Sequence, residues 1–511
     1  MKNLGFVGKL RRRPESESFF RLAKTAKQAI FVLSSMQPDA ARRKKGRSKP
    51  DRVFRHSLVL FLLCLCPFTS QATELQAGAA QVKITPPIGA PMSGYYYERA
   101  ATGVHDDLYA HALVFALRDV KIALVTLDLI GMGAPLVAQA RQAIENSSDI
   151  RGDHVMISCT HTHTGPTIPR GTQRENSKSN AARIQAAYVK ALPGQIALAV
   201  KQANSRLQPA RLSTAVGHED SISFNRRFFM TDGTVGWNPG KLNPKIIKPA
   251  GPIDPAVAVV YVVSAADEPI ATYVNFANHL DTVGGLAYSA DYPFTLSSLL
   301  SKIKGPEMVT LFAQGCGGNL NHIDVTTDVR QKGHAEAARI GMVLTGEVLK
   351  TYTRLRSIDP TSIGLRREVV KLPLPEVDGD AVARARETAA TYDTPEAAPF
   401  MELVNAFKVI SVHERQGRPL EAEVQVMTLG EDLAWVGLPA EIFVELGLAI
   451  KEASPYAMTI VTSLANGSLG YIPDRKAYAE GNYEPVSARC AAGSGERLVA
   501  ASLRLLRELK Q

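Results

Sequence analysis

The sequence has few of the features that mark several large classes of protein. Its 511 residues include only five cysteines and two tryptophans. Cys64 and Cys66 lie in an apolar segment near the N-terminus, so Cys159, Cys316 and Cys490 remain for the rest of the chain. Three cysteines form at most one bridge, which excludes a disulfide-framework protein. After residue 75 there is no internal repeat, no low-complexity linker and no apolar run of bilayer-spanning length, so the fold must rest on a hydrophobic core.

The body of the chain also lacks an excess of positive charge. The formal net charge is +10, but residues 1–56 hold 16 Lys/Arg against 4 Asp/Glu. Positions 57–511 keep 43 basic and 45 acidic residues, a net charge of −2. The high isoelectric point therefore reports the N-terminal segment, and we expect no nucleic-acid partner.

The N-terminal segment has the pattern of an export signal. The basic stretch "ARRKKGRSKPDRVFRH" precedes the apolar "SLVLFLLCLCPF", and small residues follow in "TSQATELQA". We predict a leader over residues 1–73, with translation beginning at Met1 or at Met36, and an exported domain over 74–511 in the periplasm or outside the cell. If the signal is not cleaved, it anchors the protein to the membrane.

Apolar runs of strand length alternate with helical patterns along the body. The runs cover residues 121–130, 154–162, 256–264, 270–278, 308–315, 421–430, 433–439 and 457–465. Apolar residues at helical spacing cover 134–147, 181–203, 333–352 and 495–509. This pattern predicts an α/β fold in which helices flank mixed β-sheets in one large domain, with the active site at strand carboxyl ends. The polar, acidic segment 366–420 is predicted to be a surface excursion.

Two histidines follow one of these runs in "SCTHTHTGP". If residues 154–162 form a strand, alternation places His161 and His163 on the same face. Gly165 and Pro166 end the strand directly afterwards. Both imidazoles then face one site at the carboxyl end of the strand, either as metal-binding groups or as hydrogen-bonded structural residues.

Three other predicted strands end in the same way. His279 and Asp281 follow one, Glu441 follows a second in "VGLPAEIF", and Tyr471 follows a third in a Gly-rich loop. Two neutral imidazoles and a carboxylate are a common catalytic zinc set, with one position left open for water. These residue types therefore favour a zinc site at this edge of the sheet. A phenol is an uncommon zinc ligand, and without Tyr471 the ion is held by two histidines and Glu441.

Several ordered motifs together resemble the catalytic domain of neutral/alkaline, non-lysosomal ceramidases. They are "GAAQVKITPPIGAPMSGYYYERAATGVHDDLYAHALV", "THTHTGP", "NFANHLDTV", "SADYPF" and "LGYIPDRKAYAEGNYE", and the similarity runs from about residue 76 to the C-terminus. The resemblance implies an α/β domain around one zinc ion that hydrolyses the amide bond of N-acylsphingosine, a step in sphingolipid metabolism.

The resemblance also implies a role for individual residues. His161, His279, Glu441 and Tyr471 are the expected zinc ligands, and His163 is expected to orient groups or transfer a proton. Two further residues, Arg226 in "SFNRRF" and Tyr483, are expected to stabilise the anionic tetrahedral intermediate. The alternatives are a surface ion pair for the arginine and a packed side chain for the tyrosine.

Nearby acidic residues are expected to contact the histidine ligands of the zinc ion. Asp281 and Asp291 are expected to set the tautomers of the histidines. His105 and Asp106 either line the pocket or lie in a solvated loop.

The sequence departs from the family at one motif. Family members carry a serine, described as a nucleophile, in a Gly-Asp-x-Ser-Pro-Asn segment. The corresponding "AQGCGGNLNHID" has Asn319, Asn321 and His322 in place of the aspartate, serine and proline. A serine nucleophile is excluded there, so either zinc-activated water attacks or the activity is lost. Cys316 is expected to be a buried cysteine and not a nucleophile.

The predicted function is zinc-dependent hydrolysis of ceramide or a related N-acyl lipid. The alternatives are a hydrolase of another amide or ester, and an exported lipid-binding homologue without catalysis. The family's C-terminal immunoglobulin-like domain is absent from the sequence, so peripheral membrane contact is expected to differ. The predicted partner is a lipid-like N-acyl substrate, and the sequence carries no signal for an oligomeric state.

Overall fold

The computed structural model describes residues 74–95, 99–168, 179–392 and 394–511. They belong to one compact unit that ends at Gln511. The leader predicted for residues 1–73 lies outside the described residues. Among the helices that are described, none combines the length and the apolar character that a bilayer crossing requires.

The largest sheet mixes parallel and antiparallel strands. Within the described residues it contains nine strands, of which β16 (Arg356–Ile358) pairs with β6 beside the main path. The strand order of that path is β14 (Val309–Gln314), β12 (Pro269–Phe276), β11 (Ala256–Ser264), β6 (Gln208–His218), β1 (Gln76–Lys83), β3 (Tyr109–Leu117), β4 (Val120–Leu127) and β5 (Val155–Cys159). Both ends of the path are parallel pairs, β12 with β14 and β4 with β5.

A second sheet packs face to face on the first. Its order is β17 (Ile363–Leu372), β18 (Leu420–Leu429), β19 (Leu433–Gly437) and β21 (Met458–Thr462), and the last two strands are parallel. Leu113 and Phe115 of β3 contribute to the same buried cluster as Met427 and Trp435 of the second sheet. Because side chains alternate along a strand, β3 turns Ala112 and Val114 into a different cluster on its other face.

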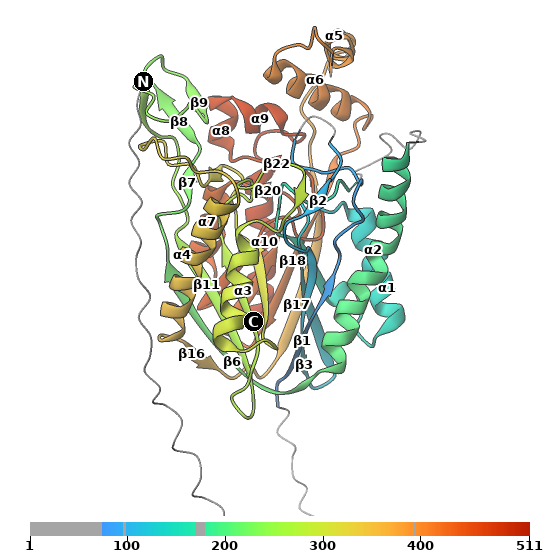
Figure 1. Cartoon of the computed structure of the whole chain (residues 1–511), viewed down its shortest axis with the longest axis vertical. Coiled ribbons are helices and arrows are strands. Elements are labelled where there is room, and N and C mark those ends of the chain that lie inside the picture. The colour runs from blue at the N-terminus through green and yellow to red at the C-terminus, as the bar shows by residue number, and fades with distance from the viewer. Residues whose placement is uncertain (1–73, 96–98, 169–178, 393) are drawn as a thin grey trace, which may run out of the picture. The chain divides into compact units, whose positions relative to one another are not determined.

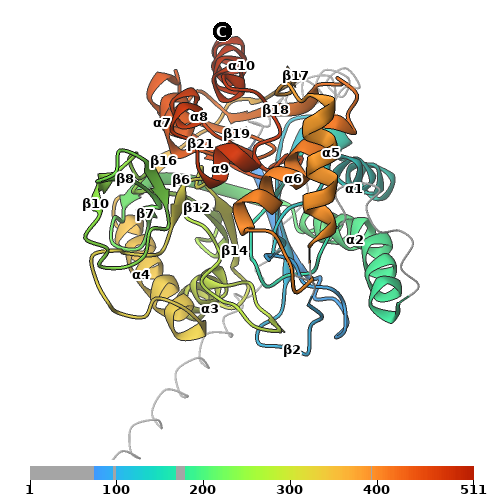
Figure 2. The same cartoon turned by 90° about the horizontal axis from the view of Figure 1, so that it is seen from above.

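Helices cover the outer face of each sheet (Figures 1 and 2). The larger sheet is covered by α1 (Ala134–Ser147) and α2 (Asn180–Ser205) at one end, and by α3 (Tyr292–Lys304) and α4 (His334–Tyr352) at the other. The second sheet is covered by α7 (Val444–Ala453) and α10 (Ser494–Lys510). The order of layers is therefore helix, sheet, sheet, helix, which confirms the predicted fold class of mixed sheets flanked by helices.

The prediction of a surface excursion over residues 366–420 is partly wrong. Residues up to Leu372 belong to β17, which pairs with β18 along its full length. Only α5 (Gly379–Ala390) and α6 (Phe400–His413) project beyond the sheets, at the top of Figure 1. The prediction was wrong for β17 because this strand carries charged residues on a half-exposed face, where exposed and intermediate side chains alternate.

Short elements connect the two sheets around one edge. They are β2 (Gly103–Val104) with β13 (Ala287–Tyr288), β7 (Phe224–Asn225) with β15 (Leu320–Asn321), β20 (Glu441–Ile442) with β22 (Tyr471–Ile472), and β8 (Arg227–Met230) between β9 (Val235–Trp237) and β10 (Ile246–Pro249). Two short helices, α8 (Arg475–Glu480) and α9 (Tyr483–Ser487), follow β22. The polar residues singled out in the sequence lie in and around these elements.

Candidate metal centre

The candidate site is built by the carboxyl ends of strands from both sheets. His161 and His163 follow β5, His279 follows β12, and Glu441 follows β19. Because β5, β12 and β19 each run parallel to a neighbour, their chains leave the sheets at the edge where ligand crevices form in α/β proteins. The predicted location of the site at strand carboxyl ends agrees with this arrangement.

The sequence predicted that alternation along a strand places the two histidines of "THTH" on one face. The structure differs, because both histidines lie beyond the end of the strand. β5 ends at Cys159, and His161 has a left-handed backbone with φ of 76°. The chain turns there, and the backbone N–H of His161 donates to the carbonyl of Leu129. The two rings still meet, edge to face, with centroids 4.9 Å apart. A non-glycine residue with positive φ is strained, and such strain concentrates at functional sites.

Four side chains converge into what we call the histidine–carboxylate cluster, made of His161, His163, His279 and Glu441. Nε2 of His161 lies 3.3 Å from Nε2 of His279 and 3.3 Å from Nε2 of His163. Oε2 of Glu441 lies 3.2 Å from Nε2 of His161 and 3.5 Å from Nε2 of His279. The three histidines form a group whose donor atoms all lie within 4.8 Å of one another.

Backbone carbonyls determine the tautomer of each histidine in the cluster. Nδ1 of His161 contacts the carbonyl of Ile130 at 2.7 Å, and Nδ1 of His279 contacts that of Gly317 at 3.0 Å. Nδ1 of His163 is 3.1 Å from the carbonyl of Gly94. A carbonyl only accepts hydrogen bonds, so each Nδ1 carries the proton and each neutral ring directs the lone pair of Nε2 into the cluster.

Burial and neighbouring charges shift the pKa values of three members of the cluster. Burial lowers the pKa of His163 to about 3. Burial and the charge of Arg226 lower the pKa of His279. Although burial opposes its charge, neighbouring His161 holds the pKa of Glu441 well below its usual range. Within the described residues, the buried Oε2 of Glu441 has no hydrogen-bond donor.

This arrangement fits a metal ion. A tetrahedral ion with metal–nitrogen bonds of about 2.0–2.1 Å separates two ligand nitrogens by roughly 3.3–3.4 Å. That separation matches the spacing between Nε2 of His161 and those of its two neighbours. Converging lone pairs and an unpartnered carboxylate oxygen are costly in a buried site unless a cation neutralises them.

Tyr471 lies beside the cluster. The β20–β22 pairing places it opposite Glu441, and its ring stacks near that of His279 with centroids 6.5 Å apart. Burial, together with the charge of Glu441, raises the pKa of Tyr471 well above 10. Tyr483 opens α9, with its ring centroid 5.5 Å from that of Tyr471. Both predicted tyrosines therefore share the site, in a row that Trp237 extends outward at 4.3 Å from Tyr483.

Arg226 is a buried arginine of the site and not a surface ion pair. Nη1 lies 3.4 Å from Nε2 of His279, and Nη2 donates to the carbonyl of Gly318 at 2.7 Å. Nε donates to Glu484 at 2.8 Å. Burial disfavours the guanidinium charge, but Tyr471 and Glu484 outweigh this and raise the pKa of Arg226. The importance of Glu484 escaped the sequence reasoning, because nothing local links it to a residue more than 250 positions away.

The segment that replaces the family's serine motif has structural partners. Asn319 accepts a hydrogen bond from the backbone of Val444 at 2.9 Å. Asn321 donates to the side chain of Asn238 at 2.8 Å. Cys316 is buried, as expected, and burial raises the pKa of its thiol to about 12. Cys159 and Cys490 are also free and buried, so these three cysteines form no disulfide.

The expectation that Asp281 and Asp291 set the histidine tautomers is wrong. Asp281 pairs with His322 at 3.3 Å, and Asp291 accepts from the backbone of Val283 and caps α3 at Tyr292. Backbone carbonyls do the expected work, and they carry no signal in a sequence because every residue has one. For His105 and Asp106 the expectation was that they either line the pocket or lie in a solvated loop. The two side chains pair with each other at 2.9 Å.

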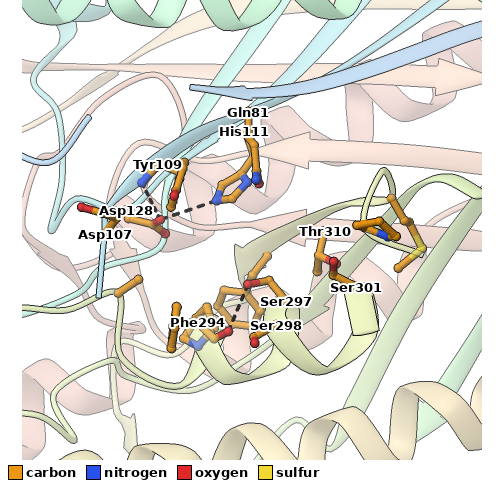
Figure 3. A pocket seen from close by; sticks show the side chains of 15 residues that line it. Gln81, Asp107, Tyr109, His111, Asp128, Phe294, Ser297, Ser298, Ser301 and Thr310 are labelled. Atoms are coloured by element: carbon orange, nitrogen blue, oxygen red, sulfur yellow. Dashed lines mark hydrogen bonds and ion pairs between the residues drawn. The ribbon is translucent and has the colours of Figure 1, made fainter. Parts of the chain in front are cut away.

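A separate polar pocket lies between β3 and α3 (Figure 3). Tyr109, His111 and Asp128 face Ser297 and the following turn of α3 across it. None of the predicted site residues is among those that line it. The pocket is connected to the cluster only indirectly. Asp128 accepts a hydrogen bond from the backbone of Tyr109 at 2.9 Å, and this contact holds the segment that continues to Ile130, whose carbonyl contacts His161.

The fold and the cluster define a layered α/β protein with a buried set of metal-ligating groups at its strand ends. No family model matches the chain. A curated relative, neutral ceramidase from Pseudomonas aeruginosa, is 25% identical in an alignment that covers 77% of this chain. The crystal structure of neutral ceramidase from Pseudomonas aeruginosa has a TM-score of 0.65 with 20% identity, over 86% of this chain and 75% of that one.

A second solved structure, described as a ceramidase complexed with C2, has a TM-score of 0.63 with 18% identity, over the same shares of the two chains. These findings confirm the resemblance carried by the sequence motifs: the chain is similar in sequence and in fold to neutral ceramidases. It spans 66% of the length of the curated relative, just under two thirds.

Proposed function

We propose that this protein is a zinc-dependent hydrolase of the amide bond of N-acylsphingosine or a related N-acyl lipid. The observation that carries the proposal is the convergence of the Nε2 atoms of His161 and His279 on the carboxylate oxygen Oε2 of Glu441, which has no hydrogen-bond donor among the described residues. The relationship to a neutral ceramidase supports the choice of reaction, and a neighbour described as complexed with C2 supports a lipid-like N-acyl substrate.

His161, His279 and Glu441 would hold the ion, with Tyr471 as the fourth ligand. Bound Zn²⁺ polarises a carbonyl group and lowers the pKa of a water molecule to about 7. His161 and His279 are almost fully buried, and their Nδ1 contacts hold them in the required orientation before any ion binds. Such preorganisation by neighbouring groups strengthens metal affinity.

His163 is the proposed proton carrier. The carbonyl of Gly94 fixes the proton on Nδ1, so the lone pair of Nε2 faces the cluster. Nε2 accepts the proton that water loses when it attacks the amide carbon, and then delivers it to the amine nitrogen as the carbon–nitrogen bond breaks. The products are a fatty acid and a sphingoid amine.

Arg226 and Tyr483 are the proposed stabilisers of the oxyanion. The guanidinium is anchored by Glu484 and Gly318, while Nη1 faces the cluster. A charged donor held in a buried site gains electrostatic strength because little water screens it. Water is the proposed nucleophile, since Asn321 occupies the serine position and the thiol of Cys316 stays protonated.

Metal analysis combined with a substrate panel tests the proposal. In purified protein dialysed without added metal, we expect one tightly bound zinc per chain by mass spectrometry. We also expect release of fatty acid from fluorescent N-acylsphingosines that a chelator abolishes and added Zn²⁺ restores. Absence of zinc from the purified protein contradicts the mechanism. Zinc without turnover of any acyl amide favours the lipid-binding alternative, and turnover of a different amide or ester redirects the substrate assignment.

Two variants test the fourth ligand and the proton carrier. Tyr471→Phe removes the phenolic oxygen and is expected to weaken zinc retention by about 10-fold or more in dialysis against a chelator. His163→Gln is expected to keep zinc but to lower kcat by about 10²–10⁴-fold, the usual contribution of a positioned acid–base group. Equal loss of zinc in both variants would make His163 a ligand instead.

Export is the remaining part of the proposal. The basic and apolar N-terminal pattern supports passage across a membrane, with the domain in the periplasm or outside the cell. We expect the mature protein to begin near residue 74 and to contact its lipid substrate at a membrane surface. N-terminal sequencing of protein recovered from cell fractions checks both the compartment and the cleavage site.

A further inference from the structure

A second group of metal-ligating side chains lies where β2 meets the start of α4. His105 follows β2, Asp106 is next to it, and His334 is the first residue of α4. One donor atom from each of the three lies within 4.8 Å of the others. We propose that these residues bind a second divalent cation of the class that prefers imidazole, with Zn²⁺ as the expected ion.

Asp106 is the fixed member of this group. Its side chain is only 2% exposed. Oδ1 accepts from the backbone of Ala290 at 2.6 Å, and Oδ2 accepts from Ser289 at 2.7 Å while also lying 2.9 Å from Nδ1 of His105. Burial raises the pKa of this carboxyl despite these contacts. A bound cation would offset the cost of burying the charge.

The two histidines supply nitrogen donors. Their rings stack with centroids 3.6 Å apart and planes 10° from parallel, so both rings cannot carry a full charge without strong repulsion. Burial and the proximity of His105 lower the pKa of His334. Neutral imidazoles are the form that binds metal.

Binding replaces a proton by the cation. The hydrogen bond between Nδ1 of His105 and Oδ2 of Asp106 spans 2.9 Å, so the two atoms must separate by a few tenths of an ångström to reach the roughly 3.3–3.4 Å between two ligands on a tetrahedral ion. When the cation takes the place of the shared proton, that proton moves to Nε2 of His105. A lone pair lies in the plane of its ring, so the parallel rings must also turn apart. The side chain of His105 is 46% exposed and has room to turn.

The site joins segments that also support the histidine–carboxylate cluster. The carbonyl of Ser289, next to the Asp106 contact, accepts from Thr162 at 2.6 Å and from Thr164 at 3.0 Å, on either side of His163. Ahead of His334, the backbone of Gly333 donates to Thr282. A cation here therefore ties the loop after β2 to α4 and stabilises the loops on one side of the cluster. The inference does not depend on the proposed function.

Equilibrium dialysis of the full chain against graded Zn²⁺, followed by metal analysis, tests the site. We expect two equivalents at saturation, with the second bound more weakly because one of its ligands is exposed. His105→Ala and His334→Ala are each expected to lose one equivalent. His218→Ala is the matched control, because His218 also pairs with a carboxylate, Asp220 at 3.4 Å, and should keep both equivalents.

Variants of the other site keep the two proposals apart. Glu441→Ala should lose the tight equivalent and retain the weak one, so failure of the proposed function leaves this inference testable. A total of one equivalent in the unaltered protein overturns the second site, as does a weak equivalent that survives in His334→Ala.

A spectroscopic measurement covers the case in which an alanine variant does not fold. Co²⁺ added to unaltered protein that carries one equivalent of zinc should broaden the imidazole signals of His105 and His334 before those of His218. Equal broadening of all exposed histidines, or none at His334, overturns the site. His334→Gln, which keeps a polar residue at the start of α4, should lose the same equivalent as His334→Ala.

Discussion

Two neighbouring regions at the strand ends are rich in polar side chains, and they differ in whether those side chains have partners. In the segment Asn319–His322 each side chain contacts other protein groups: Asn319 contacts Val444 and Glu445, Asn321 contacts Asn238 and Ile323, and His322 contacts Gln331 and Asp281. In the histidine–carboxylate cluster, the Nε2 atoms and the carboxylate face one another. Satisfied buried polar groups stabilise a fold, whereas converging unsatisfied ones indicate the place of a ligand.

The same contrast extends to charge. Arg226 and Arg227 share the buried carboxylate of Glu484, with Nε of Arg226 at 2.8 Å and Nη1 of Arg227 at 3.0 Å. Arg227 has a second partner in Glu480 at 3.1 Å. The cluster itself holds one acidic group and three imidazoles, and Nη1 of Arg226 lies 3.4 Å from Nε2 of His279. A region can thus be buried, polar and charged either for stability or for binding, and the partner list distinguishes the two.

The largest effect is expected when the cluster loses its carboxylate. Glu441→Ala should abolish zinc retention and lower kcat/KM by at least about 10³-fold, since the ion contributes several kcal/mol to the transition state. Zinc content and fatty-acid release measure both effects, with Glu445→Ala as a control that removes a nearby carboxylate bonded to Asn319. Full activity without zinc would remove the distinction between the two regions.

The next effect tests the buried charges. Glu484→Gln leaves two buried guanidinium groups without their shared carboxylate and should lower the free energy of unfolding by about 3 kcal/mol, at the low end for a broken buried ion pair because Glu480 remains. Urea denaturation measures the change. Glu480→Gln is the matched control and should cost less, since Arg226 keeps its partner. Equal losses in the two variants would contradict the assigned role of Glu484.

A smaller, pH-dependent effect is expected at the Asp281–His322 pair. Burial opposes the charge of His322, but Asp281 outweighs it and raises its pKa, so this contribution is complete below about pH 6.5 and is lost as the pH rises through the raised value. Burial also opposes the charge of Asp281, yet His322 keeps its pKa well below 3.8, so this contribution is lost only in strong acid.

His322→Gln should therefore remove about 1–2 kcal/mol of stability near pH 5.5, a discounted value because the Asp281 side chain is 30% exposed. The difference from the unaltered protein should shrink toward pH 8. Thermal unfolding across this pH range provides the measurement, and a difference that grows with pH would contradict the pairing.

The smallest effect is expected at the position of the family's serine. Asn321→Ala removes hydrogen bonds to Asn238 and to the backbone of Ile323, at a cost of about 1 kcal/mol in stability. Activity should stay within about threefold of the unaltered protein, because Asn321 takes part only in structural contacts. Steady-state kinetics decide the point: a loss of 10²-fold or more would move this segment from the structural region to the functional one.

Much of the local structure followed from residue patterns. The run at 256–264 coincides with β11, and the helical spacing at 134–147 coincides with α1, since a continuous apolar run and a 3.6-residue repeat are local properties. The placement of His279 and Glu441 directly after strands was also readable, because polar residues and prolines interrupt the apolar runs there. The presence of Asn321 where the resemblance places the family's serine was also visible in the sequence alone.

The sequence by itself determined the strand and helix alternation and the residue types that lie at the strand ends. Only the tertiary structure decided that His163 joins the cluster through a left-handed turn at His161, that carbonyls of Ile130 and Gly317 set the tautomers, and that Glu484 anchors Arg226. The reason is physical: backbone carbonyls are identical at every position, and contacts between distant segments form only once the two sheets have packed.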